Sequence, residues 1–145
     1  MKKRKGGFTL VELLIVIMII AILAGMMLLA TGSATDSAEA TRVINDLRGL
    51  KGAALLYYGD FMVWPSGNLV LALAPYFDRP FDTVRYTDLR EYTINPTFIG
   101  FTLHSSAVTK QGVRNKLVAR EVEAGLFDEN GRPYTGGLHI FMHMH

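Results

Sequence analysis

The fold of this chain is decided by residues 2–30, KKRKGGFTLVELLIVIMIIAILAGMMLLA, in which a basic head precedes a long apolar run. The eighteen residues from Leu13 to Ala30 carry no charge. The run extends back to Phe8, with Glu12 as its one ionisable residue. Because about 20 apolar residues span the hydrocarbon core of a bilayer, this segment predicts a membrane-spanning helix.

The apolar run favours a membrane anchor over a secretory signal peptide. A signal peptide has a shorter apolar core, of about 7–15 residues, followed by a small-residue cleavage site. Here the run is longer, and Gly32-Ser33-Ala34 is a poor cleavage site. The positive-inside rule places the basic head in the cytoplasm, so the C-terminal portion is expected on the outer side of the membrane.

A plain anchor does not explain Glu12. A carboxylate within a membrane-spanning helix costs a few kcal/mol on insertion scales, and such residues are usually paired and functional. The basic head lies in water and is a poor permanent partner. If the chain is cut immediately before Phe8, the new α-amino group lies one helical turn from Glu12. That amine can pair with Glu12 of its own chain or of a neighbouring subunit.

Gly7-Phe8-Thr9-Leu10-Val11-Glu12, followed by the apolar helix, resembles the processing signal of type IV pilins and type II secretion pseudopilins. The resemblance covers residues 2–30. It implies that a prepilin peptidase cuts between Gly7 and Phe8 and methylates the Phe8 amine. It also implies that Glu12 pairs with the N-terminal amine of an adjacent subunit and sets the register of a filament. The chain departs from the family at Leu29, where many members carry a proline; Gly25 and Gly32-Ser33 are the helix-weakening residues nearby.

The resemblance implies a structural subunit of a helical filament. Packing of the apolar helix between subunits would hold the filament, with Leu13, Leu14, Ile17 and Ile20 in contact. The expected partners are prepilin peptidase, further copies and related minor subunits, and an inner-membrane assembly platform. The location is the bacterial inner membrane, crossed once, with the C-terminal domain periplasmic or outside, and then the filament.

Two machines of this family fit the sequence, and a third function remains from another class. The short domain, the absent cysteine pair and Trp64-Pro65 favour a type II secretion pseudopilin over a type IV pilus pilin. The alternative class is a membrane-anchored metal- or ligand-binding domain that never polymerises.

Charge and cysteine content exclude several functions. The chain has 15 Lys and Arg against 13 Asp and Glu, but four of the basic residues form the head. Without that head the formal charge is −2, and no later cluster of Lys or Arg suits a phosphate backbone. No direct nucleic-acid partner is therefore expected. With no cysteine, disulfides, thiolate metal sites and thiol nucleophiles are excluded.

Beyond residue 30 the pattern predicts an α+β, pilin-like fold, a long helix packed against a small domain with a few antiparallel strands. We expect a leader at 1–7, a membrane helix at 8–30, its amphipathic continuation at 31–58 and a globular domain at 59–145. The continuation carries an apolar stripe at three- and four-residue steps, namely Ala40, Val43, Ile44, Leu47, Leu50, Ala54 and Tyr57.

The globular part contains several shorter predicted elements. Gly59-Asp60 is expected to end the long helix, and Ser66 or Asn68 to cap a helix over 69–73 that Pro75 stops. Residues 76–96 are predicted to be loop with one short strand at most, and 97–104 a strand. Residues 113–124 predict one helix ended by Gly125, 128–131 a turn, and 138–145 a final strand.

The C-terminal histidines are the only metal candidates with a pattern. His139, His143 and His145 share one face of a strand, but a structural site needs about four ligands, and His104 is the only other histidine. An edge strand with surface histidines is the favoured interpretation. Asp128-Glu129-Asn130-Gly131 lacks the full calcium-loop pattern. No cofactor is expected, although calcium or a transition metal stays open, and no catalytic motif supports an enzyme.

Overall fold

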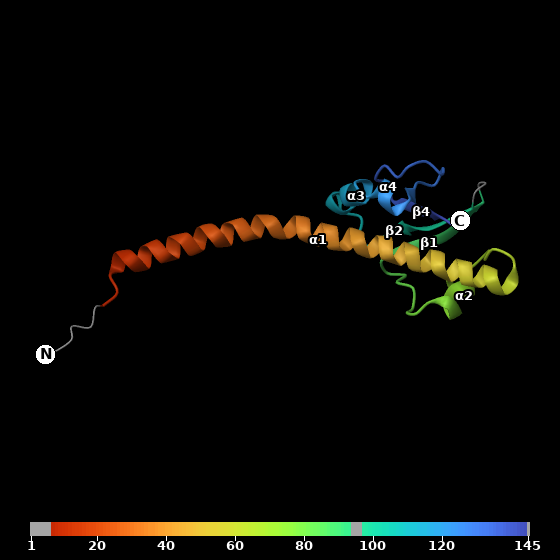
Figure 1. Cartoon of the computed structure of the whole chain (residues 1–145), viewed down its shortest axis with the longest axis horizontal. Coiled ribbons are helices and arrows are strands. Elements are labelled where there is room, and N and C mark those ends of the chain that lie inside the picture. Colours follow the sequence, from red (N-terminus) through yellow and green to blue (C-terminus); the bar gives the residue numbers. More distant parts are fainter. Residues whose placement is uncertain (1–6, 94–96, 145) are drawn as a thin grey trace. The chain divides into compact units, whose positions relative to one another are not determined.

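The computed structural model describes residues 7–93 and 97–144, and of residues 29–31, 90–93 and 97 only the backbone. A long helix, α1 (Leu10–Phe61), is followed by α2 (Leu69–Leu73), a 3-10 turn η1 (Ala74–Tyr76) and strands β1 (Tyr86–Thr93) and β2 (Thr97–Leu103). Helices α3 (Gln111–Val118) and α4 (Glu121–Ala124) precede strands β3 (Leu126–Phe127) and β4 (His139–His143). Figure 1 labels the four α-helices and strands β1, β2 and β4. The predicted α+β fold, a long N-terminal helix with a small antiparallel sheet, is confirmed.

The long helix ends later than the sequence predicts. Gly59 and Asp60 lie inside α1, which continues to Phe61. The Tyr57 and Phe61 rings pack with their centroids 4.7 Å apart, and Asp60 accepts a hydrogen bond of 2.6 Å from the Tyr76 hydroxyl. The ring contact within the helix and the tertiary hydrogen bond from Tyr76 hold the last turn, and the chain then leaves the helix at Met62, whose φ is 56°. The expected break at Gly59-Asp60 was therefore wrong.

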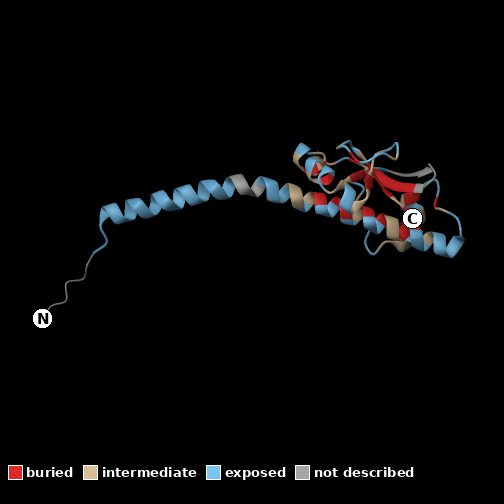
Figure 2. Ribbon diagram, turned by 45° about the horizontal axis from the view of Figure 1, so that its top comes forward, coloured by how far each residue is buried: buried red, intermediate tan, exposed pale blue. Residues whose placement is uncertain are grey.

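The contacts divide the chain into two compact units, Met1–Thr35 and Asp36–His145. In the first unit every side chain of α1 that the structure describes up to residue 28 is exposed (Figure 2). The helical backbone is unbroken through Gly25, Leu29 and Gly32, and the Leu29 side chain lies outside the described residues. By length and composition α1 holds a segment able to cross a membrane.

In the second unit, α1 carries the helical half of the core (Figure 2). The predicted stripe is buried, with Val43, Leu47 and Leu50 each 0 % exposed, and Tyr57 packs at its edge. Burying one such side chain contributes about 1.5–3 kcal/mol. This stripe packs with Ile99, Phe101 and Leu103 of β2, as the alternation of that strand predicts.

The four strands form one antiparallel sheet in the order β1-β2-β4-β3. Gly100 of β2 pairs with Phe141 of β4, and a Cβ at Gly100 would collide with the Ile140 carbonyl oxygen. Strand β1 has eight residues, with a register irregularity between Thr87 and Arg90. It is longer than the single short strand expected within 76–96, because its backbone is completed by pairing with β2.

The final strand is not at an edge. Strand β4 lies between β2 and β3, and Ile140, Phe141 and Met142 are all buried. The expected edge strand was wrong, because β3, two residues long, comes from a segment that the sequence pattern did not mark as a strand. The turn after it is confirmed: Asp128 accepts backbone hydrogen bonds from Asn130 and Arg132, both at 2.8 Å.

The smaller helices follow the prediction in part. Helix α2 has the expected bounds and is capped by Asn68, whose Oδ1 accepts from Leu71 N–H at 3.2 Å. The helix expected over 113–124 is two helices, α3 and α4, and Gly125 (φ 64°) ends the second. They separate at Arg120, whose guanidinium donates to Ser37 and Thr41 of α1.

Candidate functional site

The start of α1 contains a capping box. Thr9 precedes the first helical residue, and its backbone N–H and hydroxyl donate to Glu12 Oε2 at 2.8 and 2.7 Å. In return, Glu12 N–H donates to the Thr9 hydroxyl oxygen at 3.2 Å. The exchange satisfies backbone donors that a helix start leaves unpaired. Thr9 therefore holds the Glu12 carboxylate at the first turn.

Thr9 was missed by the sequence reasoning, which assigned no partner to Glu12 within the uncut chain. The signal was present as the T-x-x-E spacing of Thr9 and Glu12. Glu12 thus has a local partner before any cut, and pairing with a subunit's amine would add to or replace these hydrogen bonds.

The residues predicted for processing and packing are accessible. Gly7 lies before the helix and is exposed, and the Phe8 side chain is 77 % exposed. The predicted packing residues Leu13, Leu14, Ile17 and Ile20 are about half exposed in the isolated chain. An apolar surface of this size is uncommon on a soluble monomer and marks a membrane or protein contact.

A charged network joins α1 to the segment before β1 in the second unit. Asp46 accepts a hydrogen bond of 2.6 Å from Tyr86 and another of 2.6 Å from Arg79. Arg42 lies one turn earlier, with its guanidinium 4.0 Å from Asp46 and 3.9 Å from Asp82. Burial, together with the hydrogen bond to Asp46, raises the pKa of Tyr86 well above its ordinary value, so its hydroxyl keeps its proton.

A second ion-paired group lies beside the first. The Arg85 side chain is 15 % exposed, pairs with Glu39 of α1 and lies 3.5 Å from Asp82. Asp82 also accepts a hydrogen bond from the Arg85 N–H at 3.0 Å. Breaking a largely buried pair by removing one partner is costly, so these contacts hold the 76–86 segment against α1.

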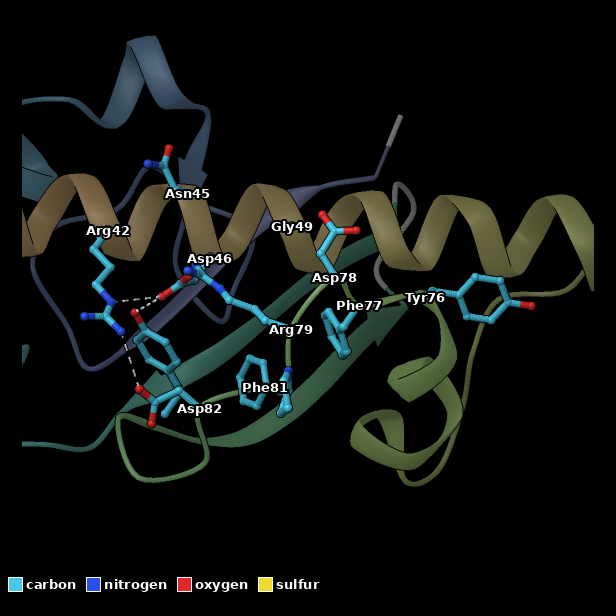
Figure 3. A pocket seen from close by; sticks show the side chains of 12 residues that line it. Arg42, Asn45, Asp46, Gly49, Tyr76, Phe77, Asp78, Arg79, Phe81 and Asp82 are labelled. Atoms are coloured by element: carbon cyan, nitrogen blue, oxygen red, sulfur yellow. Dashed lines mark hydrogen bonds and ion pairs between the residues drawn. The ribbon is translucent and has the colours of Figure 1, made fainter.

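Between these contacts the second unit contains a cleft of about 570 Å³ (Figure 3). One wall is a stripe of α1, and the other runs from Tyr76, at the end of η1, to Tyr86, at the start of β1. It is lined by Arg42, Asn45, Asp46, Gly49, Tyr76, Phe77, Asp78, Arg79, Pro80, Phe81, Asp82 and Tyr86. The sequence reasoning assigned it no function, because its two walls are about 30 residues apart in the chain.

The histidines do not assemble a metal site among the described residues. His139 is hydrogen-bonded to Thr102 at 2.9 Å and lies 3.7 Å from Glu129. His143 packs edge-on against Phe98, and His145 lies outside the described residues. No group of three or more His, Asp or Glu side chains within residues 7–93 and 97–144 is placed to hold a metal ion.

Comparison with known proteins supports the resemblance at both ends of the chain. Residues 2–28 match the prokaryotic N-terminal methylation motif. The chain is 31 % identical to the type IV major pilin protein PilE1 of Neisseria gonorrhoeae over 93 % of its own length and 74 % of that protein. It is 40 % identical to the fimbrial protein EcpC of Eikenella corrodens over 51 % and 48 % of the two chains.

One secretion protein is also similar. The type II secretion system core protein G of Pseudomonas aeruginosa is 31 % identical over 45 % of this chain and 46 % of that protein. No solved structure matches the chain. The resemblance drawn from residues 2–30 is thus confirmed, and the match to PilE1 extends it through the globular unit.

Proposed function

The chain belongs to the family of type IV pilins and type II secretion pseudopilins, and on that premise we propose that it is a filament subunit of a type IV pilus. The similarity that carries this proposal is the one to PilE1, because it covers the sheet domain as well as the N-terminal helix. In filaments of this kind, the exposed apolar half of α1 would be covered by the same helix of neighbouring subunits.

The secretion pseudopilin, which the sequence alone favoured, becomes the second candidate. Two observations support it: the similarity to core protein G over less than half of the chain, and the absence of cysteine. Deleting the gene for this chain, and measuring both surface filaments and protein secretion, separates the two candidates. Loss of surface filaments, with protein secretion unchanged, is expected. Loss of secretion with normal surface filaments would transfer the assignment to the pseudopilin.

Processing would make the assembly site. We infer that prepilin peptidase cuts between Gly7 and Phe8, and that the methylated Phe8 amine pairs with Glu12 of an adjacent subunit. The capping box supports this step because it places the Glu12 carboxylate at the first turn, next to Phe8. Mass spectrometry of the mature N-terminus tests it: methylated Phe8 is expected, and an intact Met1 would support a plain anchor.

The location of the chain and its lack of a cofactor are proposed from the same family membership. The apolar helix and the methylation motif support a membrane anchor. The basic head supports an N-terminus on the cytoplasmic side of the inner membrane. The family is one of structural subunits, and we assign no catalytic residue. We propose that assembly, with the assembly platform and minor subunits, needs no cofactor. Filaments should therefore form equally well with a metal chelator present.

A further inference from the structure

The cleft in the second unit is lined by a glycine, Gly49, although no close neighbour excludes a larger side chain at that position. Gly49 lies within α1, and a Cβ there would meet nothing within 4 Å. Glycine within a helix is less favourable than alanine. Because Gly49 lines the cleft, a larger side chain at this position would project into open space that is now about 570 Å³. A volume of that size is typical of ligand sites.

The lining of the cleft favours a positive charge. Its charged residues are two arginines and three aspartates, a formal charge of −1. Asp78 has no hydrogen-bond or ion-pair partner among the described residues. The aromatic residues Tyr76, Phe77 and Phe81 also line the space, and aromatic faces attract cations within about 6 Å.

One cation of the chain already crosses this cleft. The Arg79 side chain is 72 % exposed, yet its guanidinium reaches Asp46, whose side chain is 13 % exposed, at 2.6 Å (Figure 3). An ion pair made by so exposed an arginine is weakened because water screens the guanidinium and the pair restricts its rotamers. Arg79 is therefore exchangeable, and its position shows that the floor of the cleft accepts a guanidinium group.

We propose that this cleft binds a cationic group carried on a short apolar stem, such as a guanidinium or a primary ammonium group. The stem lies beside Gly49 against Phe77 and Phe81. The charged head pairs with Asp78 and competes with Arg79 for Asp46. The source is either a lysine or arginine side chain of a neighbouring copy or a free molecule of the same chemistry.

The test uses the full chain in detergent micelles and agmatine, which has a guanidinium and an amine on a four-carbon stem. Amide chemical shifts of Asn45 and Tyr86 report binding. Asp78→Asn should weaken binding about two- to fivefold, the range of one exposed charge pair. Gly49→Leu should abolish it by filling the space, whereas the matched control Gly49→Ala should keep it. Thermal unfolding checks that each variant is folded.

Filament assays with the same variants identify the source. If a neighbour supplies the cation, Asp78→Asn and added agmatine both reduce filament yield; if a free molecule does, agmatine binds and yield is unchanged. Either result supports the cation site. Binding of pentanoate in place of agmatine, or agmatine binding that survives Gly49→Leu, would overturn it. The neighbouring-copy source rests on the proposed function, but the two fail separately, since a chain that polymerises normally can fail to bind agmatine and a chain that binds agmatine can fail to polymerise.

Discussion

The hydroxyl of Tyr86 donates a hydrogen bond of 2.6 Å to the carboxylate of Asp46, forty residues earlier in the chain. Tyr86 is 1 % exposed and Asp46 lies on α1, so this bond joins the sheet to the long helix inside the second unit. Its ring also stacks on Phe101 with centroids 4.1 Å apart. One side chain thus links the helix, the core and the wall of the cleft.

Tyr86→Phe should lower the free energy of unfolding by about 2 kcal/mol, because a hydrogen bond to a charged group contributes about 1.5–3 kcal/mol. The ring packing is kept, so the loss reports the hydroxyl. Denaturant unfolding of the full chain in micelles measures it.

Tyr134→Phe is the matched control for that experiment. It removes a hydroxyl that donates to the neutral Gly137 carbonyl at 2.6 Å, so a loss of about 1 kcal/mol is expected. Equal losses in the two variants would show that the charge on Asp46 contributes nothing.

Stability should fall at high pH because of the same two tyrosines. Burial raises the pKa of Tyr134 to about 12, and burial with the Asp46 hydrogen bond raises that of Tyr86 further. Below an unfolded pKa near 10 this stability is fully present, and above it the unfolded chain releases protons that the folded chain keeps. The free energy of unfolding should therefore decrease by about 1.4 kcal/mol per pH unit for each tyrosine, up to its folded pKa.

Unfolding measured at pH 9, 10 and 11 tests this dependence. Removing either hydroxyl, as in Tyr134→Phe, should make the slope shallower by up to about 1.4 kcal/mol per pH unit. A slope that is the same in wild type and both variants would assign the loss to other groups.

Glu12→Ala should leave membrane insertion intact and impair filament assembly. An amine left without its carboxylate in a buried contact costs roughly 3 kcal/mol, enough to reduce assembled filament at least about tenfold. Membrane fractionation and electron microscopy of sheared filaments measure the two steps. Filaments as abundant as those of the native chain would remove the register role of Glu12.

Thr9→Ala separates helix capping from that role. The substitution removes the Thr9 hydroxyl, which donates a hydrogen bond to the Glu12 carboxylate and accepts one from the Glu12 N–H. Loss of this cap should lower the stability of the first helical turn by about 1 kcal/mol. The variant keeps Glu12, so its filament yield should lie between that of the native chain and that of Glu12→Ala.

Two glycines should respond differently to alanine. At Gly100 the new Cβ meets the Ile140 carbonyl and the Phe141 backbone, which cannot rotate away, so we expect a loss of about 1–3 kcal/mol. At Gly112, in α3, it meets only the Asp36 carboxylate, a side chain that can turn aside, and alanine gains about 1 kcal/mol in helix propensity.

Thermal unfolding of the two variants compares them directly. Gly112→Ala should be close to neutral while Gly100→Ala is clearly destabilised. A reversed order would mean that Asp36 is held more firmly than the β2–β4 pairing.

Local patterns explain which parts of the fold were predictable. The α1 stripe with Val43, Leu47 and Leu50, the β2 alternation with Ile99 and Phe101, and the Asn68 cap were all readable, because each pattern lies within one helix or strand. The end of α1 could not be predicted in this way, because it depends on a hydrogen bond to Asp60 from Tyr76, which lies in a later segment. The central place of β4 was not, because it depends on pairing with two residues, Leu126 and Phe127.

The apolar helix, the methylation motif and the family could all be recognised before folding, because those properties follow from the order of side chains along one short segment. The cleft, by contrast, could not be foreseen from any one segment. Arg79 and Tyr86 lie 33 and 40 residues after Asp46 in the chain, and no period or motif relates them to it. They meet because burying the α1 stripe under the sheet brings the segment before β1 onto the polar edge of the same helix.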